Sequence, residues 1–368
     1  MEDEEEVSSP RKIRVIRYTC SACYKAYNKK EHLVAHMKVS YHSVHQPKCG
    51  VCKKHCRSFE SLREHLIGPL PKSGCADIFL KKGCNLCMNT FATLDDLNAH
   101  RKLCCLYPTS PLGKSLVPVL RSRLEVLKLR ETIQVSGAVA LDCEMVGGGS
   151  DEKLYMCARV CLIDEGENVL FHTYVKPILA VTNYRYEVTG ITEEHLRDAM
   201  PLGQVQEKIL EILQNGESIS RLRSEGGKAR LLVGHSIEND LKCLRIFYPD
   251  HMLRDTALYI PLMKTNVVSH SLKYLSKTYL GYEIQTGFHD PYEDCVAAMR
   301  IYKRMRAQNH PVEEHTTPVI GQQSKGSSTI FDSMQPGELE KMSSDDLFKI
   351  SRPNYRCWCL DTRPRSQP

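Results

Sequence analysis

A spacing of cysteines and histidines that occurs three times before residue 107 constrains the fold of this sequence more than any other feature. The first copy, CSACYKAYNKKEHLVAHMKVSYH, separates its candidate ligands by two, twelve and five residues, and these are Cys20, Cys23, His36 and His42. Two thiolates and two helix-borne imidazoles make a tetrahedral Zn²⁺ shell, and the metal supplies folding free energy that so small a core cannot. We therefore predict a zinc-binding module whose apolar core contains Tyr27 and Leu33.

Two further copies follow. The third, CNLCMNTFATLDDLNAHRKLC, has the candidate ligands Cys84, Cys87, His100 and Cys104, with Cys105 as an alternative to Cys104 and with Phe91 and Leu97 in the core. The second, CGVCKKHCRSFESLREH, supplies Cys49, Cys52 and His65 at the same intervals, with Leu62 in the core. No ligand follows within five residues of His65, so we predict Cys75 as the fourth, with Cys56 as a competitor. The chain should bind two or three structural zinc ions.

The remaining composition is that of an intracellular protein. An export signal is not visible in MEDEEEVSSP, and no apolar run approaches the roughly 18 residues that cross a bilayer. Seventeen cysteines would indicate disulfides in a secreted protein, but ten of them fall between Cys20 and Cys105, within the repeated frame. We expect a soluble intracellular protein with reduced or metal-bound thiols and no membrane partner.

Positive charge is concentrated in the cysteine-rich part. Residues 1–10 carry five acids and no base, whereas residues 11–106 carry 18 Lys or Arg against 6 Asp or Glu. This balance favours a polyanionic partner, above all nucleic acid, although a solvated charged surface is the plain alternative. The modules lack short regular linkers, which argues against a binding mode in which successive modules each contact about three base pairs of the DNA major groove. RNA or a protein fits the irregular spacing better.

Composition divides the chain into five parts. We assign 1–16 to a disordered tail, 17–106 to three zinc-finger-like modules, 107–135 to a linker with a short helix, 136–306 to an α/β domain and 307–368 to a mostly disordered tail. Near the end, SRPNYRCWCLDTRP holds the single tryptophan, Trp358, between Cys357 and Cys359. This segment is either a docking element or a metal site that lacks partners.

The α/β domain opens with three β-rich segments, GAVALDCEMV, LYMCARVCLID and NVLFHTYV, which predict an antiparallel meander. Helical periodicity follows in ITEEHLRDAM, LGQVQEKILEILQ, ENDLKCLRIF, SLKYLSKTYL and PYEDCVAAMRIYKRMRAQ, with one short strand, RLLVGHS, between the second and the third. We therefore predict a mixed sheet flanked by helices.

The stretch LDCEMVGGG, residues 141–149, places two acids in an apolar strand. Asp142 and Glu144 project from one face because side chains alternate across a strand. Neighbouring carboxylates raise each other's pKa unless a cation neutralises them, and oxygen ligands favour Mg²⁺ or Mn²⁺. For this pair alone, a strand end that faces solvent is the simpler explanation.

Two later segments change that judgement. VGHSIENDLKCL places Asp240 in the first turn of a helix that follows a strand, and FHDPYEDCVAAM places His289 just before a helix and Asp294 inside it. Pro291 suits a first helical position, so His289 and Asp294 can approach the same end of the sheet. Each residue alone has an ordinary explanation as a helix N-terminal acid or a surface histidine. Together with the strand acids they form a constellation suited to binding metal.

These segments resemble a known family. LDCEMVG, GHSIENDL and HDPYED look like the three signature motifs of the DEDDh 3′-to-5′ exonucleases. LDCEMVG, RDTALY, SLKYL and EDCVAAMRIYKRM are similar to the RNA exonuclease 4-like branch, which also contains the interferon-stimulated exonuclease, and the zinc-finger array is similar to plant-type members. The resemblance covers about residues 136–306. HDPYED departs from the commoner H-S-x-x-E-D, which bears on substrate detail.

The resemblance implies an RNase H-like sheet that binds two Mg²⁺ or Mn²⁺ ions. Their ligands would be Asp142, Glu144, Asp240 and Asp294, and His289 would be the general base. It further implies an exoribonuclease that releases 5′-mononucleotides from single-stranded RNA 3′ ends in RNA processing or decay, ribosomal RNA included, in the nucleus or nucleolus. Met145 and His235 are expected to contact substrate, although Met145 serves equally as core and Gly147–Gly149 equally as a hairpin turn or as a pocket floor.

Two other functions fit the same residues. A DNA 3′-to-5′ exonuclease would use the same chemistry, because discrimination rests on a contact to the 2′-hydroxyl that a sequence does not show. A catalytically silent, zinc-finger nucleic-acid-binding regulator would keep the fold as a scaffold. The intact set of four acids argues against the silent regulator.

Overall fold

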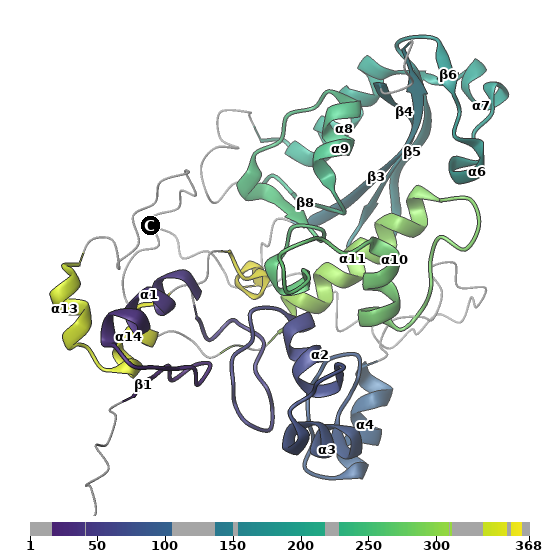
Figure 1. Ribbon diagram of the computed structural model, residues 1–368. Coiled ribbons are helices and arrows are strands. Elements are labelled where there is room, and N and C mark those ends of the chain that lie inside the picture. Colours follow the sequence, from purple (N-terminus) through teal and green to yellow (C-terminus); the bar gives the residue numbers. More distant parts are fainter. Residues whose placement is uncertain are drawn as a thin grey trace, which may run out of the picture.

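The computed structural model describes residues 17–40, 42–104, 137–149, 154–217, 228–308, 310, 334–351 and 355–362. These residues form N-terminal modules, an α/β domain and a C-terminal segment that contacts both (Figure 1). The predicted tail 1–16, the linker 107–135 with its short helix, and Cys105 lie outside the described residues. Among the described helices, none combines the length and the apolar character that a bilayer-spanning helix needs.

A mixed sheet is the centre of the α/β domain. Its strands, in sheet order, are β7 (Met200–Pro201), β5 (Val169–Lys176), β4 (Leu154–Asp164), β3 (Ala138–Gly148), β8 (Leu231–Gly234) and β9 (Leu253–Asp255), and β6 (Val181–Asn183) pairs with β3. β3, β4 and β5 form the predicted antiparallel meander, whereas β8 is parallel to β3 and β9 is parallel to β8. The prediction of a mixed sheet flanked by helices is confirmed.

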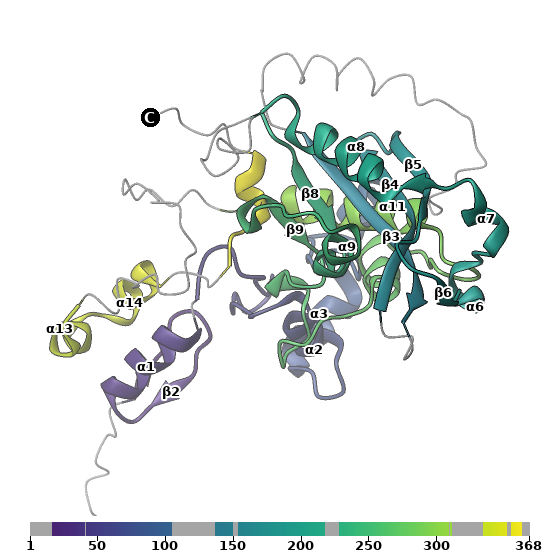
Figure 2. The ribbon, with the colours of Figure 1, turned by 90° about the horizontal axis from the view of Figure 1, so that it is seen from above.

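Helices cover both faces of this sheet (Figures 1 and 2). The described helices of the domain are α6 (Tyr186–Thr189), α7 (Glu193–Arg197), α8 (Leu202–Gln214), α9 (Ile237–Leu244), α10 (Leu272–Leu275) and α11 (Pro291–Arg306), with the short 3-10 turns η2 (Asp250–Met252) and η3 (Ile260–Leu262) and the π-helical η4 (Ser276–Leu280). α11 packs across β3, β4 and β8. α9 packs on the other face, where the thiols of Cys143, Cys157 and Cys243 lie within 4.8 Å of one another.

Two helices are shorter than the periodicity predicts. The helix expected over residues 191–200 spans only α7, because Met200 and Pro201 pair with β5. The helix expected over residues 238–247 ends at Leu244, because Arg245 takes the left-handed conformation with φ 56° and caps it.

Two of the three glycines after the acidic pair are strand residues. Gly147 and Gly148 pair with β6, and Gly149 ends the strand with φ 81°. A Cβ at Gly148 would lie 2.6 Å from Cε of Met156, so a larger residue here would require the flexible end of that side chain to move. The alternative in which these residues are simply a hairpin turn is therefore wrong for Gly147 and Gly148.

Short hairpins and helices build the N-terminal modules. They are β1 (Tyr18–Thr19), β2 (Ala26–Tyr27), α1 (Lys30–Ser40), α2 (Phe59–Ile67), α3 (Ser73–Lys82) and α4 (Leu94–Cys104). The predicted core residues Leu33, Leu62 and Leu97 are buried. α2 is joined to the α/β domain, since the hydroxyl of Tyr274 donates a hydrogen bond to Oε2 of Glu60 at 2.9 Å. The second module is thus packed against the α/β domain.

Parts of the C-terminal segment, which the sequence predicts to be mostly disordered, are folded. The segment forms α13 (Pro336–Lys341), α14 (Ser344–Ile350) and the turn η5 (Trp358–Thr362). Leu339 and Leu347 join Leu33 and Met37 of the first module in one apolar cluster, and α13 and α14 lie beside α1 in both views (Figures 1 and 2). The prediction weighed polar composition, but a few apolar residues are enough when a small module offers them an incomplete core.

Candidate active site and cysteine–histidine clusters

The acidic site forms where β3 extends beyond its parallel neighbour. β8 pairs with β3 only through Ala138–Ala140 and ends at Gly234, so the chain turns there into α9. A Cβ at Gly234 would lie 2.9 Å from the carbonyl oxygen of Leu141, so glycine permits this close approach. The turn brings Asp240 against the free edge of β3, where its Oδ1 accepts a hydrogen bond from the backbone N–H of Cys143 at 3.0 Å.

Four carboxylates meet at this point from three elements. Asp142 and Glu144 come from β3, Asp240 comes from α9 and Asp294 comes from the first turn of α11. Glu144, Asp240 and Asp294 are 6%, 4% and 5% exposed. The charge of Asp294 contributes to the raised pKa of both strand acids, which places all these groups within electrostatic reach. The structure therefore assembles the acids that the sequence motifs single out.

The four carboxylates have perturbed pKa values. Burial raises the pKa of Asp142 well above its usual value, and the other three acids raise it further. Burial and then Asp294 raise the pKa of Glu144 to about 7, against a lowering by Arg159. Burial raises the pKa of Asp240 and brings that of Asp294 to about 7. Such a cluster is electrostatically unfavourable as four anions, so it favours either protons or cations.

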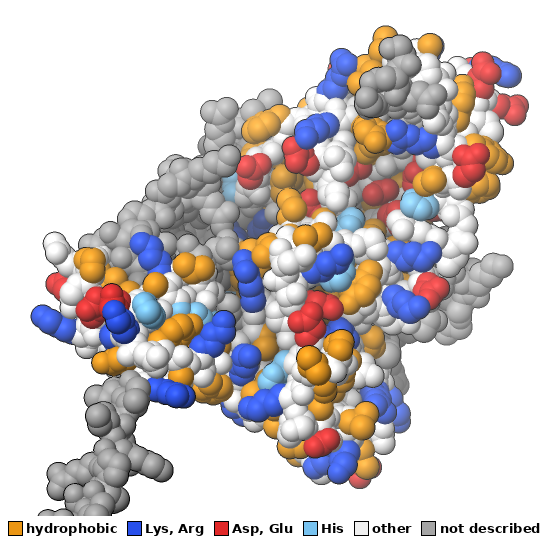
Figure 3. Space-filling model, in the orientation of Figure 1, with side chains coloured by type: hydrophobic (Ala, Val, Ile, Leu, Met, Phe, Trp, Pro, Cys, Tyr) orange, Lys and Arg blue, Asp and Glu red, His pale blue; other side chains and the backbone are white. Residues whose placement is uncertain are grey.

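A hard divalent cation fits this donor set. Oδ2 of Asp294 accepts a hydrogen bond from Nε2 of Gln285 at 2.8 Å, but its Oδ1 is buried and has no hydrogen-bond partner among the described residues. A buried carboxylate oxygen without a partner beside other carboxylates is suited to Mg²⁺ or Mn²⁺, which prefer oxygen ligands. Acidic side chains also show in a recess of the face drawn in Figure 3, with Lys and Arg side chains around it.

Comparison with known proteins identifies the α/β domain. The RNase T exonuclease family model matches residues 139–302. RNA exonuclease 4 of Saccharomyces cerevisiae is 31% identical over 210 residues, which are 56% of this chain and 68% of that protein. The chain belongs to the RNA exonuclease 4 family.

Other relatives match the exonuclease domain over smaller shares of their length. RNA exonuclease 4 of Homo sapiens is 36% identical over 185 residues, which are 50% of this chain and 40% of that protein. The Candida glabrata protein of the same name is 35% identical, over 47% of this chain and 62% of that protein. The chain therefore spans less than two thirds of these two relatives. Among solved structures, the Saccharomyces cerevisiae PAN2 pseudoubiquitin-hydrolase-RNase module is 27% identical, with 48% of this chain and 28% of that chain covered and a TM-score of 0.38.

The other predicted site residues flank the acids. His289 lies in the loop before α11, where its backbone N–H donates to the carbonyl oxygen of Val188 at 2.7 Å. Burial lowers its pKa, and so does Lys273, which favours the neutral imidazole. Nδ1 of His235 lies 2.9 Å from Oγ1 of Thr256, and burial lowers the pKa of His235 to about 4. Met145 is partly buried and follows a bulge in the pairing of β3 with β4.

Several polar residues that support the site were not predicted. Asp255 holds the turn into α9, because its carboxylate accepts hydrogen bonds from the backbone N–H groups of Ser236 at 2.8 Å and Ile237 at 3.0 Å. Arg159 pairs with Glu144 across the strands and forms an ion pair with Asp290 at 3.3 Å. A sequence gives little signal for such residues, although Asp255 lies in the quoted RDTALY segment.

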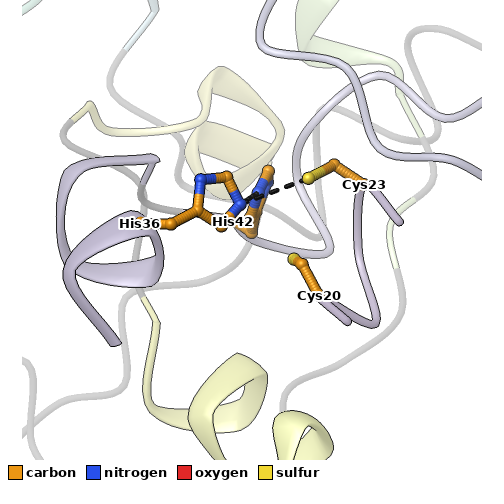
Figure 4. Close-up of side chains that lie close together, drawn as sticks. All are labelled: Cys20, Cys23, His36 and His42. Atoms are coloured by element: carbon orange, nitrogen blue, oxygen red, sulfur yellow. Dashed lines mark hydrogen bonds between the residues drawn. The ribbon is translucent and has the colours of Figure 1, made fainter. Parts of the chain in front are cut away.

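The first module brings its four predicted ligands together. Cys20, Cys23, His36 and His42 point toward a common centre (Figure 4). Nε2 of His36 lies 3.2 Å from Sγ of Cys23 and 3.2 Å from Nε2 of His42. Hydrogen bonding with Cys20, and also with the two histidines, lowers the pKa of Cys23 to about 2, which favours a thiolate. Separations of this size suit ligand atoms that share one tetrahedral ion at about 2.0–2.3 Å from each.

The other two modules show the same arrangement. Cys49, Cys52, His65 and Cys75 form one group, and Cys84, Cys87, His100 and Cys104 form another, with ligand atoms within 4.8 Å in each. Cys75 thus takes the fourth place in the second group, and Cys56 is not in that group. Nη2 of Arg304 donates to Sγ of Cys104 at 2.8 Å, so α11 offers a cation to a site whose three thiolates would leave about −1 with zinc bound.

Proposed function

We propose that this chain is a metal-dependent 3′-to-5′ exoribonuclease that releases 5′-mononucleotides. The observation that carries the proposal is the convergence of four carboxylates, three of them buried, from β3, α9 and α11; Oδ1 of Asp294 has no hydrogen-bond partner among the described residues. Membership of the exonuclease family supports the reaction class, and the names of the relatives support RNA as the substrate.

The chain's own residues would divide the work as follows. Asp142, Glu144, Asp240 and Asp294 would hold two Mg²⁺ or Mn²⁺ ions. When bound, such ions stabilise negative charge on the attacking and leaving oxygens of an in-line phosphoryl displacement. His289, whose lowered pKa favours the neutral imidazole, would accept the proton of the attacking water at an imidazole nitrogen. Asp255 and Gln285 are positioning residues, because each holds an acid or its helix in place.

Substrate contacts would come from residues next to the acids. The register shift between Glu144 and Met145 leaves Ala158 of β4 without a partner on β3, and the side chain of Met145, next to the acids, is partly exposed. We propose that the terminal base packs against Met145, with His235 nearby as a neutral hydrogen-bonding group. The proposal of RNA as the preferred substrate rests on the names of the relatives.

The test is a digestion of matched 5′-labelled RNA and DNA oligonucleotides in Mg²⁺ or Mn²⁺. We expect a ladder of shortening on single-stranded RNA, slower cutting of DNA, and a loss of about 10²–10³-fold or more with Asp142→Asn, which removes one electrostatic stabiliser of the transition state. Equal activity of Asp142→Asn and parent would contradict the assignment, and faster cutting of DNA would replace RNA with DNA as the substrate. Binding of RNA without any cutting would favour the silent regulator.

We further propose that the three N-terminal modules bind zinc and deliver longer, structured RNA to the active site. Their net positive charge supports this role, and so does the packing of the second module on the exonuclease domain. The excess of Lys and Arg in residues 11–106 also supports residence in the nucleus or nucleolus. A fluorescent fusion of the protein that is excluded from the nucleus would contradict this proposal.

Cys20→Ser should distinguish the binding of long RNA by the modules from the hydrolysis reaction in the active site. Because it removes one ligand of the first module, it should weaken binding to long structured RNA and leave the hydrolysis of short oligonucleotides unchanged. Gel-shift titration and short-oligonucleotide kinetics on the same preparation measure the two effects. An equal loss on both substrates would show that the module supports the fold and does not select RNA.

A further inference from the structure

A group of four metal-binding side chains lies outside the three repeated frames. Its members are His45, between the first and second modules, His310, just after α11, and Cys357 and Cys359 in the C-terminal segment. One candidate ligand atom from each lies within 4.8 Å of the others. The set is two thiols and two imidazoles, the same composition as in the first module. The chain thus brings residues from three distant segments to one point.

One nitrogen atom in this group has more close neighbours than ordinary hydrogen bonds can account for. Nδ1 of His310 lies 2.9 Å from Nδ1 of His45, 3.0 Å from Sγ of Cys359 and 3.5 Å from Sγ of Cys357. One imidazole nitrogen carries at most a single proton, so it cannot donate to all these neighbours at once. One cation shared by all four atoms satisfies them together, and the spacings match those in the first module.

The surroundings hold the ligands in place. Cys357 and Cys359 are 2% and 5% exposed, and Trp358 between them stacks on Tyr259 with ring centroids 3.8 Å apart. The hydroxyl of Tyr355 donates to the carbonyl oxygen of His45 at 3.2 Å. The hydroxyl of Tyr259 lies 3.6 Å from Sγ of Cys357, as expected of a partner that orients a thiolate ligand. These contacts come from the exonuclease domain and from the C-terminal segment itself.

We propose that His45, His310, Cys357 and Cys359 bind a further structural Zn²⁺ ion that fastens the C-terminal segment to the exonuclease domain and to the modules. With two thiolates and two neutral imidazoles the loaded site carries no net charge, which suits its burial. The site adds a structural metal beyond the proposed nuclease and its three N-terminal modules. In this site His45 and His310 are the further ligands that the sequence around Cys357 and Cys359 does not contain.

The single tryptophan of the chain gives this site its own reporter. Trp358 lies between two of the ligands, whereas the three repeated frames contain no tryptophan. We expect that full-length protein loaded with Co²⁺ in place of Zn²⁺ has strongly quenched tryptophan emission, because a coloured ion then lies beside the indole. Zinc-loaded protein keeps full emission.

Two variants locate the effect. His310→Gln should bind one zinc ion fewer per chain than the parent, by elemental analysis, and should lose the quenching by Co²⁺. Cys84→Ser is the matched control, because it should also lose one zinc ion, from the third module, but should remain quenched. His45→Gln serves as a second test from another segment and should behave as His310→Gln does.

The proposal is overturned if cobalt-loaded and zinc-loaded parent emit equally, or if a folded His310→Gln or His45→Gln protein keeps both its zinc content and its quenching. These outcomes do not depend on nuclease activity. A failure of this site therefore leaves the exonuclease proposal intact, and the reverse also holds.

Discussion

Asp294→Asn is expected to abolish most of the nuclease activity and, at the same time, to stabilise the metal-free protein. Asp294 is 5% exposed, its Oδ1 has no hydrogen-bond partner in the part of the chain that the structure describes, and burial raises its pKa to about 7. Asparagine removes the buried charge and can still accept the hydrogen bond from Gln285. We expect a loss of activity of about 10²–10³-fold or more and a gain of about 1–3 kcal/mol in the free energy of unfolding at pH 8.

The gain should depend on pH with a defined sign. A carboxyl whose pKa is raised in the folded state binds more protons there than in the unfolded chain. The parent therefore loses stability as the pH rises from the ordinary carboxyl pKa of 3.8 through the folded-state pKa of about 7. The asparagine side chain of the variant has no such proton to lose, so the difference between variant and parent should grow as the pH rises to about 7 and should level off above it.

Metal should reverse the order of stability. Mg²⁺ or Mn²⁺ binds the folded parent and stabilises it by mass action, while the variant gains less because it lacks one ligand. Chemical denaturation with and without Mn²⁺, at several pH values, measures all three effects. Glu238→Gln removes an exposed acid of α9 and is the control, with little change expected. A metal-free Asp294→Asn protein that is less stable than the parent throughout this range would contradict the electrostatic account.

Asp361→Ala should destabilise the protein by roughly 3–5 kcal/mol, because it leaves a buried arginine without its partner. Nε and Nη2 of Arg254 donate to the two carboxylate oxygens of Asp361 at 2.7 Å each, and the two side chains are 3% and 1% exposed. The hydroxyl of Tyr302 donates to the same carboxylate at 3.1 Å. Arg254 is on β9, so this ion pair joins the C-terminal segment to the edge of the sheet.

Two comparisons make the test specific. Glu283→Ala removes an exposed partner of Lys277 and should leave the free energy of unfolding nearly unchanged. Replacing Arg254 and Asp361 together with leucine should recover much of the loss, because no unpaired charge is then buried. Thermal or urea unfolding measures each variant. If Asp361→Ala were as mild as Glu283→Ala, the segment would contribute little to the fold.

The parts of this fold that follow from local pattern were predictable. The alternation in LDCEMV predicts a strand that carries Asp142 and Glu144 on one face, and the period of residues 202–214 predicts α8 with the same bounds. The first cysteine–histidine frame likewise depends on spacing within about twenty residues. In each case the interacting residues are near one another in the chain, so the spacing in the sequence carries the geometry.

The contacts between distant segments were not predictable in this way. His45 and Cys359 are 314 residues apart, and neither Cys-x-Cys nor a single histidine indicates its partner. Leu339 and Leu347 lie in a polar stretch, and their burial depends on the apolar face of α1, which a local window does not include. Gln285 supports Asp294 by one hydrogen bond, without a motif around it. Such relations exist only once the tertiary structure has formed.

The sharing of one apolar cluster between α1 and the α13–α14 pair fixes an order of events during synthesis. The ribosome makes residues 17–40 first and residues 336–350 after the whole exonuclease domain. Because domains generally fold as they emerge, the exonuclease domain can form while the first module still has an exposed core. The module that emerges first is therefore among the last parts of the chain to be completed.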